Sequence, residues 1–84
     1  MMKKDKKKLT LDHPVTYQIK VPGALDKKWL DWNEGMMVMV ESEKNSSPIT
    51  TLTITVDQAA LQGLLRYLYS LGLPLISVIC VDFN

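Results

Sequence analysis

The sequence predicts one small domain of the α+β class, and three observations lead to that class. Strict alternation of apolar and polar residues marks two half-buried strands, at 15–21 and 49–56. Runs that are apolar at nearly every position mark two further strands, at 36–40 and 75–81. An amphipathic helix with its own start and stop residues lies between the last two strands, at 58–71.

A short helix is predicted between the first two strands. Pro22 and Gly23 end the first strand, and Leu25, Trp29 and Trp32 then recur at i, i+4 and i+7, on one helical stripe. Gly35 would stop this helix. Two or three turns of helix are not stable alone, so the tryptophans are expected to pack on a neighbouring element.

Two strands and a turn are predicted from 36 to 56. The run 36–40 turns polar at Glu41, which is typical of a strand covered on both faces. The polar segment 44–48 ends in proline and forms the turn. In the strand that follows, threonines 51, 53 and 55 face outward, and the inward face consists of Leu52, Ile54 and Val56.

The long helix carries residues that define both of its ends. Asp57 can cap the N–H groups of the first turn, and Val56 and Leu61 have the spacing of a hydrophobic staple. Gly72 can take the left-handed conformation that closes a helix, and Pro74 prevents continuation.

The predicted order is therefore strand, short helix, strand, strand, long helix, strand, which is that of a ferredoxin-like βαββαβ domain. Right-handed crossovers place both helices on one face of a four-stranded antiparallel sheet. The first and third strands are then central, and the second and fourth are the edges. A three-stranded meander with a packed helix and a fourth strand is the alternative.

Charge is distributed unevenly along the chain. Residues 1–8 contain five lysines and one aspartate and carry +4, whereas the remaining residues carry −3. We therefore expect residues 1–14 to be a basic, disordered arm ahead of a domain at 15–84. Such an arm could attract nucleic acid only weakly and without sequence preference. Neither a signal peptide nor a membrane span is predicted, because polar residues interrupt the apolar stretches.

The predicted edge strands are more apolar than those of a well-protected monomer. The central strands turn threonine, glutamine and lysine to the helix-free face, whereas the edges are apolar on both faces. An apolar edge without a charge or proline invites pairing with another chain. We expect a two-fold homodimer that covers the final strand, with the candidate edge residues Ile76, Val78 and Cys80. Alternatively, the basic arm, the first segment or the C-terminal tail covers these edges within one chain.

Four aromatic residues are candidates for an interaction surface: Trp29, Trp32, Tyr67 and Tyr69. The tryptophans either stack on a ligand or anchor the short helix to the sheet. The tyrosines flank the leucine stripe of the long helix and cannot both share it, so at least one should be partly exposed.

No catalytic, cofactor-binding or metal-binding set is predicted. The acidic residues are spread along the chain, with no pair on one structured face near a base. His13 is the only histidine and Cys80 the only cysteine, which leaves no zinc spacing and no disulfide within one chain. A single cysteine in an apolar run also suits a reducing, cytoplasmic location.

Much of the chain, from about Tyr17 to Val78, resembles a group of short uncharacterised bacterial proteins. The most distinctive part is the run Asp57-Gln58-Ala59-Ala60-Leu61-Gln62-Gly63-Leu64-Leu65, which leads to Leu71-Gly72-Leu73-Pro74-Leu75-Ile76-Ser77-Val78. Members of that group often have a histidine where Gln62 stands. The resemblance implies a compact cytosolic bacterial domain and supplies no catalytic residue.

These features favour a non-enzymatic protein-interaction or ligand-sensing domain that works as a homodimer. A small-molecule enzyme or carrier with a pocket between helices and sheet is one alternative, and converging polar groups in a closed pocket would favour it. A non-specific nucleic-acid binder that uses the lysine-rich arm is the second. No cofactor is expected.

Overall fold

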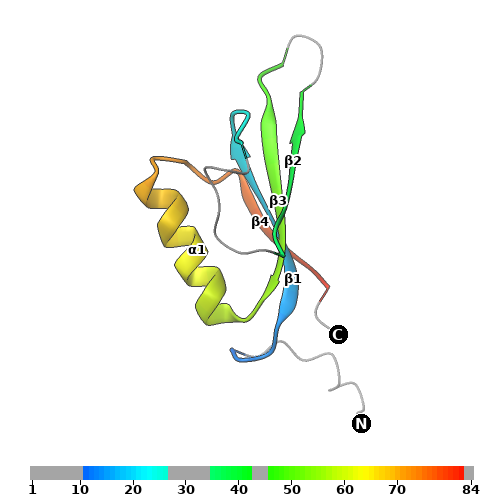
Figure 1. Ribbon diagram of the computed structural model, residues 1–84, viewed down its shortest axis with the longest axis vertical. Coiled ribbons are helices and arrows are strands. Elements are labelled where there is room, and N and C mark those ends of the chain that lie inside the picture. Colours follow the sequence, from blue (N-terminus) through cyan, green and yellow to red (C-terminus); the bar gives the residue numbers. More distant parts are fainter. Residues whose placement is uncertain (1–10, 27–34, 43–45, 83–84) are drawn as a thin grey trace.

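The computed structural model describes residues 11–26, 35–42 and 46–82. They form four strands and one helix, namely β1 (Val15–Pro22), β2 (Met37–Glu41), β3 (Ile49–Val56), α1 (Gln58–Ser70) and β4 (Ser77–Asp82). Figure 1 shows the strands as one sheet, with α1 alongside it.

The strands form an antiparallel sheet in the order β2-β3-β1-β4. The α+β class and the four-stranded antiparallel sheet are therefore confirmed, with the first and third strands central. Because β1 pairs with β3 and not with β2, the first three strands do not form a meander, and the meander alternative is wrong. The described residues contain one helix, so the two-helix βαββαβ order is not observed. The predicted short helix falls largely on residues 27–34, which lie outside the described ones, and Leu25 itself lies in irregular chain.

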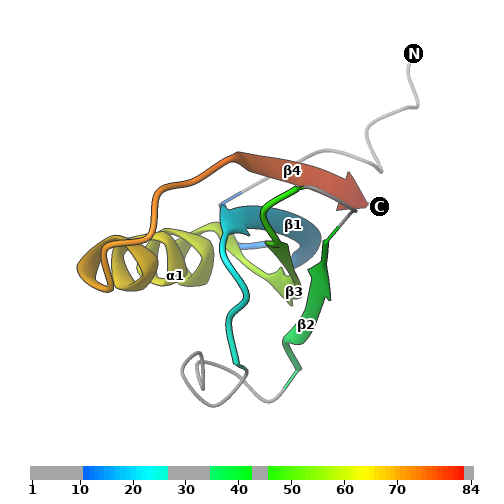
Figure 2. The ribbon, with the colours of Figure 1, turned by 90° about the horizontal axis from the view of Figure 1, so that it is seen from above.

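The register of the two central strands decides what each face of the sheet presents. Ile19 lies opposite Leu52, and both side chains are fully buried on the face that α1 covers. The next pair along the strands, Lys20 opposite Thr51, lies on the other face because successive side chains alternate. Figure 2, viewed along the sheet from above, shows α1 on one side of the curved sheet only.

A single apolar core lies between α1 and the sheet. The helix contributes Leu61, Leu64 and Leu68, each at most 4% exposed. Burial of such a side chain contributes about 1.5–3 kcal/mol. The sheet and its connections contribute Val15, Tyr17, Ile19, Val21, Met36, Leu52, Ile54 and Val56.

The N-terminal end of α1 is as predicted. Asp57 is the N-cap, and its Oδ1 accepts a hydrogen bond of 2.9 Å from the Ala60 N–H. Gln58 then ties the first turn to the sheet, because its Nε2 donates to the buried Tyr17 hydroxyl at 2.6 Å.

The C-terminal end of α1 has the predicted closing glycine, but the helix ends at Ser70, one residue earlier than predicted. Leu71 is the C-cap, and Gly72 follows in the left-handed region with φ of +80°. The Leu73 N–H donates to the Leu68 carbonyl at 3.1 Å, which closes a Schellman motif. This turn directs the chain back toward the sheet edge.

The final strand begins two residues later than predicted. Leu75 and Ile76 belong to the connection that carries the chain from α1 to the sheet edge, and β4 starts at Ser77. Ile76 still donates its N–H to the Lys20 carbonyl at 2.7 Å, so the connection already contacts β1 there.

Candidate interaction surface

Among the strands of the described residues, β4 is an outer one, and β1 is its one neighbour. Its register with β1 places Val78 opposite Ile19 and Ile79 opposite Gln18. Val78 therefore lies on the face that carries α1, and Ile79 lies on the helix-free face. Each face of β4 therefore presents an apolar side chain at the sheet edge.

Five apolar side chains around β4 are exposed. We define the β4 patch as these residues, which are between 39% and 51% exposed: Leu75, Ile76, Val78, Ile79 and Val81. No charged residue or proline lies between Pro74 and Asp82 in the chain. The patch thus lacks the charges and prolines with which soluble proteins usually protect an exposed edge.

The three predicted edge residues have different positions. Val78 and Cys80 lie in β4, and Ile76 lies one residue before the strand begins. It nevertheless belongs to the β4 patch. Cys80 lies opposite Tyr17, and its free thiol is partly buried against the core. Cys80 therefore offers less surface to a partner than its neighbours do.

The aromatic candidates do not form one surface in the described part of the chain. Tyr69 is 83% exposed, as predicted for at least one tyrosine of this helix. Tyr67 is partly buried and packs against the core. Trp29 and Trp32 lie outside the described residues.

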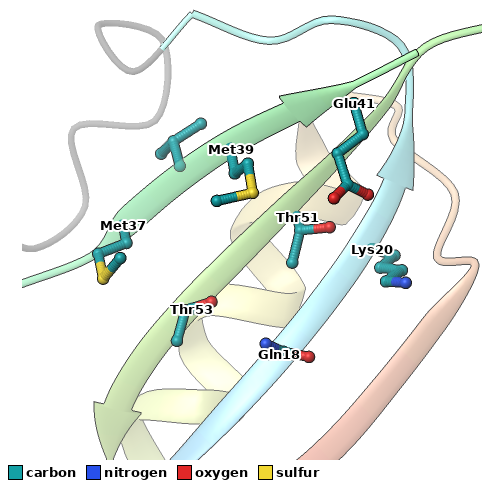
Figure 3. A pocket seen from close by; sticks show the side chains of 8 residues that line it. Gln18, Lys20, Met37, Met39, Glu41, Thr51 and Thr53 are labelled. Atoms are coloured by element: carbon teal, nitrogen blue, oxygen red, sulfur yellow. The ribbon is translucent and has the colours of Figure 1, made fainter. Parts of the chain in front are cut away.

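A concavity of about 340 Å³ opens on the helix-free face, between β2 and the central strands (Figure 3). Its lining includes side chains of three strands: Gln18, Lys20, Met37, Met39, Glu41, Thr51 and Thr53. No motif in the sequence predicts this site. The signal that locates it is the register, which brings Lys20, Thr51 and Met39 into one row across the sheet.

Residues 11–26, 35–42 and 46–82 contain no group of three or more His, Cys, Asp or Glu side chains that could hold a metal ion. Within the same ranges, no helix combines the length and the apolar character that crossing a membrane requires. Every buried polar side-chain atom among them has a hydrogen-bond partner.

The chain belongs to the family described as "Domain of unknown function (DUF8691)", whose model matches residues 16–79. This match spans β2, β3 and α1 in full, β1 from Thr16 onward and the first half of β4, as far as Ile79. Comparison with curated proteins and with solved structures found no match.

Proposed function

We propose that this DUF8691 domain is a non-enzymatic protein-interaction domain that works as a homodimer, with β4 as the pairing edge. The observation that carries this proposal is the β4 patch, where exposed apolar side chains occupy both faces of an unprotected outer strand. Removal of such apolar surface from water by a second chain is energetically favourable.

An antiparallel pairing of β4 with its symmetry mate fits a two-fold dimer. Identical strands then exchange backbone hydrogen bonds, and the two sheets become one of eight strands. Val78 would meet apolar side chains of the partner on the helix side, and Ile79 would do so on the helix-free side. One pairing event thus covers the apolar side chains of both faces.

Two further features remain proposals. We expect a ferredoxin-like arrangement, which likewise has its first and third strands at the centre of the sheet. We expect a reducing cytoplasmic location, supported by the single free cysteine, Cys80.

Light scattering coupled to size-exclusion chromatography tests the homodimer. At micromolar concentration the wild-type chain should show twice the 9.5 kDa mass of one chain. Ile79→Lys should shift it to the mass of one chain, because an unpaired ammonium buried in the interface is costly. We expect a dissociation constant raised at least about 100-fold, or roughly 2.7 kcal/mol.

Met39→Lys is the matched control for this substitution. Met39 is 54% exposed and Ile79 47%, and both lie on the helix-free face, but Met39 is on the opposite outer strand. Met39→Lys should leave the dimer mass unchanged. A monomeric wild-type chain would contradict the homodimer. Dissociation by Met39→Lys but not by Ile79→Lys would show that β4 is not the pairing edge.

A further inference from the structure

The concavity on the helix-free face combines apolar and polar walls. β2 contributes the thioether side chains of Met37 and Met39, which are 62% and 54% exposed. β3 contributes the floor, formed by Thr51 and Thr53. Thioethers adapt readily to apolar groups of varied shape, and a hydroxyl can both donate and accept a hydrogen bond.

Charged groups of opposite sign face this floor from either side. Lys20 on β1 lies directly opposite Thr51, and Glu41 on β2 lies opposite Ile49, two residues before Thr51 on β3. Figure 3 shows the Glu41 carboxylate reaching over β3 beside Thr51, and Lys20 on β1 with its ammonium turned away from that carboxylate. Because β3 separates the two charged residues, a small ligand over Thr51 can meet both.

These groups together match the chemistry of one ligand class. A carboxylate complements Lys20, an ammonium group complements Glu41, and an apolar side chain can lie along the two methionines. Gln18 adds an amide beside Thr53, with both donor and acceptor atoms. The volume, about 340 Å³, is at the lower end of the roughly 300–1,000 Å³ range of small-molecule sites, which suits a ligand of amino-acid size.

We propose that this concavity binds a zwitterionic ligand of the α-amino-acid class that carries an apolar side chain. The proposal is independent of the homodimer, because no residue of the β4 patch lines the concavity. The site is open to solvent, so affinity for a free amino acid is modest, with a dissociation constant of about 0.1–1 mM.

A titration followed by amide NMR shifts tests the site, using the full chain labelled with ¹⁵N and L-leucine as the probe. Saturable shifts should map to residues 18–20, 37–41 and 51–53. Isopentylamine, which lacks the carboxylate, and isocaproate, which lacks the ammonium group, should each bind at least about tenfold more weakly. Phenylalanine and methionine should bind as leucine does.

Substitution of the two charged residues completes the test. Lys20→Gln and Glu41→Gln should each weaken leucine binding at least about tenfold. Arg66→Gln is the control, since Arg66 is an exposed charge on α1, and it should leave binding unchanged. The proposal is overturned if no probe gives saturable shifts up to about 10 mM, if the shifts map to α1 or β4, or if the single-charge analogues bind as well as leucine.

Discussion

The two outer strands of this sheet differ in the apolar surface that they present. On β2, Met37, Met39 and Val40 are exposed, and the first two border a concavity that also contains charged and hydroxyl groups. Around β4 the exposed residues form the longer β4 patch, with no charge among them. An edge position alone therefore does not identify an interface. The larger number of exposed apolar side chains around β4, and the absence of charge among them, favour β4 for assembly and leave β2 for ligand binding.

The largest expected effect comes from truncating the core residue that lies next to each outer strand. Ile19 on β1 lies opposite Val78 of β4, and Leu52 on β3 lies opposite Val38 of β2; both are fully buried. Ile19→Ala and Leu52→Ala should each lower the free energy of unfolding by about 2–5 kcal/mol, measured by urea denaturation at fixed protein concentration.

Self-association of the same variants should differ between the two positions. Ile19→Ala should also weaken the dimer, because Val78 loses the side chain that supports it. Leu52→Ala should not. Should either chain fail to fold, Ile19→Val and Leu52→Val provide milder truncations. An equal loss of association from both positions would remove the distinction between the two edges.

A smaller effect is expected at Thr50, which anchors the chain near the β2 side. Its buried hydroxyl donates to the Gly23 carbonyl at 2.6 Å and accepts from the Leu25 N–H at 3.0 Å. Thr50→Val leaves both backbone groups without this partner and should cost about 1–3 kcal/mol of stability in thermal or urea unfolding. The dimer mass should stay unchanged.

Thr53→Val is the control for that substitution. Thr53 is half-buried on the helix-free face, so its replacement should change stability by no more than about 0.5 kcal/mol. If Thr53→Val destabilises the protein as much as Thr50→Val, the anchoring role of the Thr50 hydroxyl is wrong.

The smallest effects are expected at two glycines in the left-handed region, one near each outer strand. Gly72, with φ of +80°, directs the chain from α1 toward β4, and Gly23, with φ of +99°, follows β1. An added Cβ meets open space at both positions, so only backbone strain opposes it. Each alanine variant should lose about 1–2 kcal/mol, read from thermal unfolding.

Self-association separates these two glycine variants. Gly72→Ala should weaken the dimer slightly, because it disturbs the connection that positions Leu75 and Ile76. Gly23→Ala should leave the dimer intact. The opposite pattern would place the assembly surface at the β2 side.

Local sequence signals were sufficient where the structure depends on neighbouring residues. The alternation at 49–56 predicts β3 with its observed limits, and Asp57 and Gly72 identify the two ends of α1. The same alternation predicts which faces of the central strands are polar. Caps and alternation act within one or two turns or a single strand, so they can be recognised without knowledge of the fold.

Two features that depend on contacts between distant segments were not predicted, namely the start of β4 and the concavity. Leu75 and Ile76 are as apolar as the strand that follows, so only the approach of the chain to β1 shows that β4 begins at Ser77. The concavity requires the register of three strands, which brings Lys20 and Glu41 to one face. Neither residue is distinctive in the sequence alone.

Amide hydrogen exchange of the full chain, at two protein concentrations, tests most directly whether β4 is the covered edge. In an isolated chain, the outward-facing N–H groups of either outer strand exchange quickly. We expect slow exchange throughout residues 77–81, slower still at the higher concentration, and rapid exchange of the outward N–H groups of residues 37–40 at both. Rapid exchange in β4 at both concentrations, or protection that grows on β2 instead, would contradict this assignment.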